Sequence, residues 1–169
     1  MRWSAVLMLA AMAGPAAAWQ AVPGEDPMDD TITAFISQVT VESTRFNFIA
    51  LGFKCWKDQP DETLFLISTS QTFDSAANYP PAVLVEVRVD KNPIIAVTMA
   101  PVNRRGFFGL VVGTAKQPDV ATLLARIGTA KKTISLGFAT SAYRVPVTGS
   151  TKAVSRFTQI CGLKLPFVQ

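Results

Sequence analysis

The chain has 169 residues, a formal net charge of +4 and 49% hydrophobic residues, values typical of one globular domain and not of a chain disordered throughout. It contains no histidine and two cysteines. These counts exclude catalytic triads with a histidine base, zinc sites with imidazole ligands, four-cysteine zinc sites and iron–sulfur clusters held by four thiolates.

The first eighteen residues are typical of a secretory signal peptide. Arg2 precedes an apolar run of nine residues, Ala5 to Ala13, and Gly14-Pro15 separates this run from three alanines. Nine residues would span about 14 Å as a helix, which is too short for a membrane anchor. We therefore expect cleavage after Ala18, export to the periplasm and no transmembrane segment in the mature chain.

Residues 19–30 are expected to form a flexible leader, because Pro23, Gly24, Pro27 and four acidic residues interrupt any regular pattern. Residues 31–169 then form a single domain. Runs of β-branched and aromatic residues predict eight strands, at 31–42, 46–56, 63–70, 82–90, 94–100, 106–113, 133–139 and 142–147. Turn residues are expected at 57–62 and at 101–105.

The clearest period lies in residues 82–90, where four valines alternate with Leu84, Glu86, Arg88 and Asp90, the pattern of a half-buried antiparallel strand. Apolar residues recur at helical spacing after Pro118, with Gly128 as the expected end, and again after Ser150 or Thr151 as N-cap, with Gly162 as the expected end. The prediction is an α+β fold: an antiparallel, meander-type sheet or sandwich of about seven or eight strands with two helices packed on it.

The two cysteines, Cys55 at the end of an early strand and Cys161 on the apolar face of the last helix, are predicted to form a disulfide in an oxidising compartment. The bond would close a loop of about 106 residues and contribute ~4–5 kcal/mol. The alternative is a reactive thiol pair, for which the sequence shows neither C-x-x-C spacing nor a nearby base.

Charge is divided along the chain, since residues 19–90 carry a net charge of −7 and residues 91–169 a net charge of +10. One interpretation is a surface for an anionic partner such as lipid headgroups or polysaccharide. The other is that both halves interleave in one sheet and neutralise each other. Nucleic acid is not expected as a partner of an exported chain. The candidate anion contacts are Lys131, Lys132, Arg144, Lys152 and Arg156.

The segment RRGFFG at 104–109 is a candidate contact loop, because it pairs two charges with two aromatic side chains on a turn. The alternative is an ordinary hairpin turn with one phenylalanine in the core. The candidate partner contacts are Arg104, Arg105, Phe107 and Phe108.

No motif for catalysis, phosphate binding or metal binding occurs, and the acidic residues cluster in the turn-like segments 25–30 and 57–62. We therefore expect no catalytic residues, no metal site and no cofactor. A histidine-free hydrolase is the less favoured alternative, which a deep pocket with convergent polar groups would support.

The order of these segments resembles the type VI secretion-associated VasI-like family of small periplasmic proteins. The resemblance covers roughly residues 29–163 and rests on LGFKCWKDQPDETLFLIS, VLVEVRVDKNP and the closing VTGSTKAVSRFTQICG. It implies a non-enzymatic accessory role in the envelope, acting through a protein partner in secretion or envelope assembly. The alternative function is binding of an anionic envelope component through the basic C-terminal half.

Overall fold

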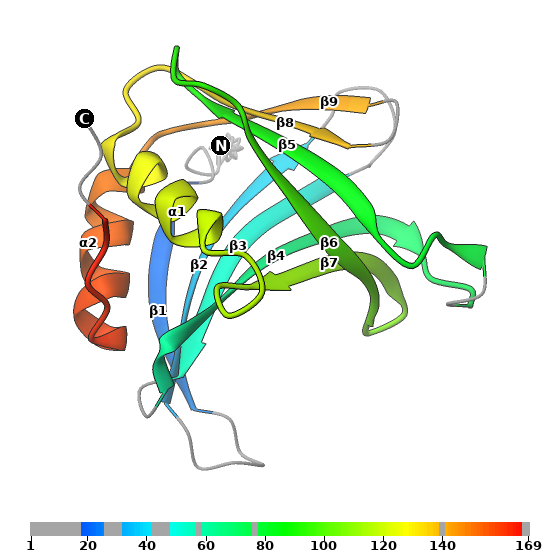
Figure 1. The fold of residues 1–169 in the computed structure, drawn as a ribbon, viewed down its shortest axis with the longest axis horizontal. Coiled ribbons are helices and arrows are strands. Elements are labelled where there is room, and N and C mark those ends of the chain that lie inside the picture. The colour runs from blue at the N-terminus through cyan, green and yellow to red at the C-terminus, as the bar shows by residue number, and fades with distance from the viewer. Residues whose placement is uncertain are drawn as a thin grey trace, which may run out of the picture.

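A computed structural model describes residues 18–25, 32–41, 48–56, 59–75, 78–138 and 141–166. Its nine strands form one antiparallel sheet in the order β1-β2-β3-β4-β7-β6-β5-β8-β9. The sheet curls into a half-barrel, and two helices pack on its concave side at one end (Figure 1). The α+β class and the antiparallel sheet are thus confirmed, but the architecture is a half-barrel and not a meander or a sandwich.

The elements follow the predicted order, with one strand added at the N-terminus. The strands are β1 (Gln20–Glu25), β2 (Ile32–Val41), β3 (Phe48–Trp56), β4 (Gln59–Thr72), β5 (Val83–Val89), β6 (Ile95–Arg104), β7 (Phe107–Gly113), β8 (Ile134–Phe138) and β9 (Ser141–Val145). The helices are α1 (Asp119–Thr129) and α2 (Ser150–Cys161).

Strand β6 gives the sheet its curl by changing partner halfway along. Ile95–Met99 pair with β5, whereas Ala100–Arg104 pair with β7. The turn predicted at 101–105 is therefore wrong, because Pro101 lies inside β6 just after the change of partner, where the sheet bends. Where β6 has no pairing to β7, the side chain of Gln117 takes its place, accepting from Thr98 N (3.0 Å) and donating to Thr98 O (2.9 Å).

The alternation predicted for residues 82–90 is confirmed. Val85, Val87 and Val89 are buried in the core, whereas Leu84, Glu86 and Arg88 are exposed. The buried valines pack with inward-facing side chains of β3, β4, β6, β7 and β8 and with the apolar stripes of both helices in one hydrophobic core. The half-barrel is therefore filled on its concave side by α1 and α2.

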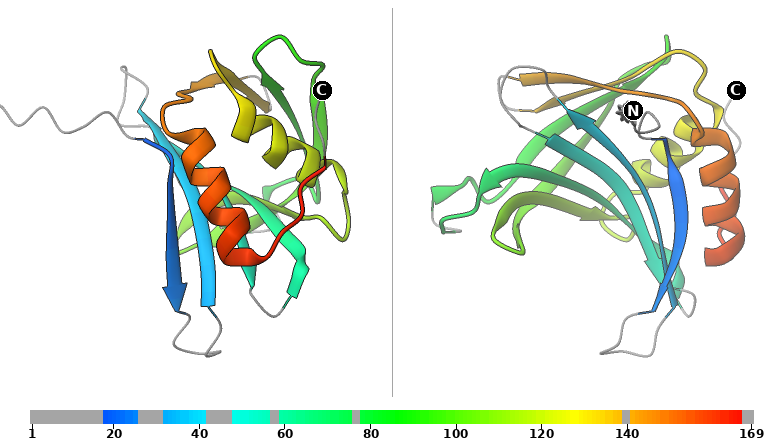
Figure 2. Two further views of the ribbon diagram at one scale, coloured as in Figure 1. Left: turned by 90° about the vertical axis from the view of Figure 1, so that its left-hand side faces the viewer. Right: turned by 180° about the vertical axis from the view of Figure 1, so that it is seen from behind.

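Helix α2 lies along β1 and β2, and α1 lies between α2 and the strands β4, β5 and β6 (Figure 2). The helices approach closely at Gly128, where an added Cβ would lie 2.9 Å from Val154 Cγ1. Gly128 does not end α1 as predicted, because the helix continues to Thr129; its missing side chain instead makes room for α2. Gly162 ends α2 in the left-handed conformation as predicted (φ 68°).

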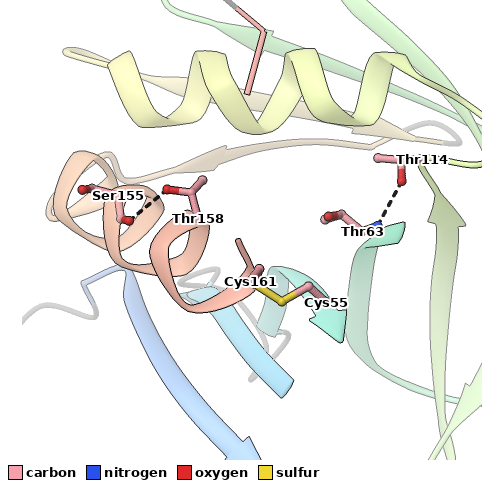
Figure 3. The surroundings of a disulfide bond; sticks show 6 residues. All are labelled: Cys55, Thr63, Thr114, Ser155, Thr158 and Cys161. Atoms are coloured by element: carbon pink, nitrogen blue, oxygen red, sulfur yellow. Dashed lines mark hydrogen bonds between the residues drawn. A yellow bond between two sulfur atoms is a disulfide. The ribbon is translucent and has the colours of Figure 1, made fainter. Parts of the chain in front are cut away.

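The disulfide joins Cys55 of β3 to Cys161, the last residue of α2, with the two Cα atoms 6.1 Å apart and both residues buried (Figure 3). The predicted pairing is thus present. Beside it, Thr63 N donates to Thr114 Oγ1 (2.9 Å) and ties the start of β4 to the segment before α1 (Figure 3). The C-terminal helix is therefore joined covalently to the end of β3, the third strand from one edge of the sheet.

Part of the predicted leader belongs to the fold, which corrects the flexible assignment of residues 19–30. Trp19 is 3% exposed and packs in the core, and its indole Nε1 donates to Pro146 O (2.7 Å). Its backbone N donates to Thr148 O (3.1 Å), and β1 then pairs with β2 along its whole length. Pro23 and Gly24 misled the prediction because β1 is an edge strand, where such residues are tolerated. Residues 26–30 of the predicted leader lie outside the described residues.

Two smaller predictions also fail. The N-cap of α2 is Gly149 (φ 80°), so Ser150 is the first helical residue, and its buried hydroxyl has no hydrogen-bond partner among the residues that the structure describes. The turn predicted at 57–62 is shorter, since Trp56 pairs with Gln59 at the start of β4. No helix in the described part of the chain is long and apolar enough to cross a membrane.

Candidate functional site

A groove of about 810 Å³ is lined by residues near the ends of β4, β5, β7, β8 and β9 and by the segment before β5. In Figure 1 these strand ends lie at the right, away from the two helices. This volume lies within the range of pockets that bind small molecules or peptide side chains. We call it the mouth groove. Its described lining consists of Gln71, Tyr79, Pro80, Ala82, Val83, Leu84, Glu86, Phe108, Gly137, Phe138 and Ala142.

One wall of the mouth groove is built from stacked aromatic rings. Tyr79 lies 4.6 Å from Phe108 and 5.0 Å from Phe73, measured between ring centroids. Two hydrogen bonds fix this wall: Phe73 N donates to Gly106 O (2.9 Å), and the side-chain Oγ1 of Thr69 donates to Phe108 O (3.0 Å). The wall is therefore a preformed apolar surface and needs little ordering when something binds.

The rest of the described lining comes mainly from β5, β8 and β9. Leu84 is 58% exposed, and Phe138 stacks on Tyr143 with ring centroids 5.4 Å apart. Glu86 is the one charged side chain in the described lining, and Gln71 adds an amide. This composition of apolar surface with few polar groups suits recognition of apolar groups. The described residues include no cluster of side chains that could hold a metal ion.

The segment RRGFFG forms the β6–β7 hairpin next to the mouth groove. Arg105 (φ 55°) and Gly106 (φ 88°) make a two-residue turn of the kind that suits the twist of paired strands. Neighbouring side chains on a strand point to opposite faces. Phe108 is therefore a buried part of the groove wall, whereas Phe107, 43% exposed, lies on the outer face beside its cross-strand partner Arg104.

The side chain of Arg104 packs over Gly109, where any larger residue would displace it. A Cβ at Gly109 would lie 2.8 Å from Arg104 Cδ and 2.9 Å from Arg104 Cγ, so the arginine stem lies across that glycine. Burial first, and then the charge of Arg105, lower the pKa of Arg104. Of the four candidate contacts of this hairpin, Phe108 thus lies in the groove, Arg104 and Phe107 lie on the outer face, and Arg105 lies in the turn.

The candidate anion contacts come from three parts of the fold. Lys131 and Lys132 follow α1, at the end of the molecule away from the mouth groove. Arg144 lies on β9, with Ser135 of β8 between it and Arg88 of β5 in the register. Lys152 and Arg156 are exposed one turn apart on α2.

Asp90 organises the surroundings of Lys131 and Lys132. Its carboxylate accepts from the backbone N–H groups of Lys131 (2.8 Å), Lys132 (2.8 Å) and Thr133 (2.9 Å). These bonds, that of Lys131 foremost, hold the pKa of the Asp90 carboxyl below its ordinary value, although partial burial acts in the other direction. This role of Asp90 was not predicted, because its one signal in the sequence is an acid at the end of the alternating segment 82–90.

The same turn brings two further cations to this place. Lys91 follows Asp90 directly, and Arg126 of α1 donates from Nη1 to Pro93 O (2.7 Å). We call the group of Lys91, Arg126, Lys131 and Lys132 the basic tip. The sequence did not indicate Lys91 and Arg126 as anion contacts. They come close to Lys131 and Lys132 only because the 90–94 turn bonds to α1 and to the segment after it.

No family model, curated protein or solved structure matches this chain.

Proposed function

We propose that this chain is a non-enzymatic binding protein of the cell envelope that acts through contact with a partner protein at the mouth groove. The observation that carries the proposal is the preformed aromatic wall of Tyr79 and Phe108, which lines a groove of about 810 Å³ together with an exposed leucine, Leu84. Exposed apolar surface of this kind marks binding sites in folded domains.

The partner surface that fits best is an extended protein segment with apolar side chains. The groove is open to solvent and its lining is mostly apolar, so a segment could bury two or three side chains while its backbone stays in water. Glu86 and Gln71 would then orient the segment through hydrogen bonds to its backbone N–H groups.

The setting of this proposal is the periplasm, reached through cleavage after Ala18. The Cys55–Cys161 disulfide is compatible with an oxidising compartment. The resemblance to the type VI secretion-associated VasI-like proteins supports an accessory role in secretion or envelope assembly.

Site-directed crosslinking in the native envelope tests the proposal. A photoreactive residue in place of Ala142, an exposed lining residue, should crosslink to a partner, and the substitution Leu84→Arg in the same chain should abolish the crosslink. The same photoreactive residue in place of Val22, which is exposed on β1, is the matched control. A crosslink that survives Leu84→Arg, or that also forms at position 22, would refute binding at the groove.

A further inference from the structure

The basic tip is a compact group of charged residues, and none of them lines the mouth groove. Asp90 ties the turn after β5 to the segment after α1 through three backbone N–H bonds, and its own N donates to Thr133 O (2.8 Å). The bond from Arg126 to Pro93 O adds a third chain segment. Four cations from three parts of the sequence are therefore held around one short turn.

The charges of the basic tip do not cancel. Asp90 contributes one carboxylate, whose oxygens face backbone N–H groups, against four cationic side chains. Lys91, Lys131 and Lys132 are exposed. Counted over these described side chains, the tip carries a net positive charge and presents a positive potential to its surroundings.

An apolar side chain lies among these charges. Ile94, directly after Pro93 in the same turn, is 53% exposed, whereas its neighbour Ile95 is buried in the core. A soluble polyanion would gain little from an exposed isoleucine. A lipid bilayer would gain from it, since an apolar side chain enters the boundary of headgroups and acyl chains while lysines contact anionic headgroups.

We propose that the basic tip docks this protein on the surface of an anionic phospholipid bilayer, with Ile94 entering the headgroup layer and the lysines contacting lipid phosphates. The geometry leaves the mouth groove accessible. Strand β5 begins at the groove with Val83 and Leu84 and ends at Val89, directly before Asp90. At about 3.3 Å per residue, Leu84 and Asp90 are separated by about 20 Å along the strand. The proposal does not depend on the proposed function at the groove.

Sedimentation of the mature chain with vesicles tests this docking. Vesicles of phosphatidylcholine and phosphatidylglycerol in equal parts should bind the protein at low ionic strength, and vesicles of phosphatidylcholine alone should not. The double substitution Lys131→Gln with Lys132→Gln should weaken binding about 25-fold, at about fivefold per cation. The substitution Ile94→Ser, which leaves the charge unchanged, should weaken it about tenfold.

The matched control is Lys152→Gln with Arg156→Gln, which removes the same charge from exposed positions of α2. This variant should bind within about threefold of the unchanged protein. Equal losses from both double variants would overturn the proposal, because net charge alone would then govern binding. Lack of binding to phosphatidylglycerol vesicles would overturn it too.

A third outcome would replace the bilayer with a different partner. If Ile94→Ser binds vesicles as well as the unchanged protein does, and dextran sulfate binds through the same lysines, the tip recognises soluble polyanions and the proposal fails. Crosslinking from Ala142 reports on the groove separately, so failure at the tip and failure at the groove are distinguishable.

Discussion

The two ends of the half-barrel differ in how they are built. At the closed end, α2, the disulfide, Trp19 and Asp90 each join segments that lie far apart in the sequence. At the open end, β6 no longer pairs with β5, and aromatic side chains line a groove that stays accessible. The closed end thus contains the long-range contacts that stabilise the fold. The open end can therefore expose the apolar surface needed for binding.

The largest expected effect is loss of the disulfide from the closed end. Replacing Cys55 and Cys161 with alanine should lower the free energy of unfolding by about 4–5 kcal/mol, because the unfolded chain is no longer constrained over 106 residues. Chemical denaturation measures the change. Reduction of the unchanged protein should reproduce the loss, and the reductant should leave the double variant unaffected. A smaller loss than about 1 kcal/mol would mean that the bond does not stabilise the closed end.

Removal of the tryptophan that links the N-terminus to α2 should follow in size. Trp19→Ala should lower the free energy of unfolding by about 3–5 kcal/mol, since it empties a core position and removes the indole bond to Pro146 O. Trp19→Phe keeps most of the apolar contact and should cost less. If thermal unfolding shows no difference between Trp19→Ala and the unchanged protein, residue 19 does not belong to the core.

The third prediction concerns Asp90 and depends on pH. Its pKa is lower in the folded state than its ordinary value of 3.8, so the carboxylate contributes stability that is complete above that value and is lost as the pH falls through the folded-state pKa. Asp90→Asn, which tolerates the left-handed backbone conformation there (φ 52°), should cost about 1–2 kcal/mol at neutral pH.

The pH profile separates this charge effect from simple loss of a hydrogen bond. The stability difference between the unchanged protein and Asp90→Asn should stay constant above about pH 5 and shrink below about pH 4. Urea unfolding across this range measures it. A difference that is the same at all pH values would show that ionisation of Asp90 does not matter.

Local patterns in the sequence predicted most of the elements but not their arrangement. The alternation of β5 and the apolar stripes of the helices arise from side chains facing one core, so they are visible in a single sequence. The partner change within β6 depends on which strands lie beside it, and no local pattern encodes that. Pro101 was therefore assigned to a turn, although it lies inside a strand.

The candidate site shows the same division. The segment RRGFFG was visible as a motif, and its turn at Arg105 and Gly106 follows from local chemistry. Its relation to Tyr79 and Phe138 depends on how the two halves of the sheet diverge, so the mouth groove could not be predicted. Asp90 was assigned by pattern to the exposed face of a strand, whereas its function comes from a segment some forty residues later.

The smallest expected effect on stability is that of a substitution at the open end. It is best seen by comparing two neighbouring residues of β5, Leu84 and Val85. Leu84→Ser should change the free energy of unfolding by less than about 0.5 kcal/mol, because the side chain is 58% exposed. Val85→Ser, one residue later and fully buried, should cost about 3 kcal/mol from lost packing and a buried hydroxyl. Denaturation of both variants measures the contrast, and partner crosslinking from Ala142 should fail in the stable Leu84→Ser variant. If Leu84→Ser instead destabilises the fold as much as Val85→Ser, then Leu84 supports packing, and the open end is not a surface kept free for binding.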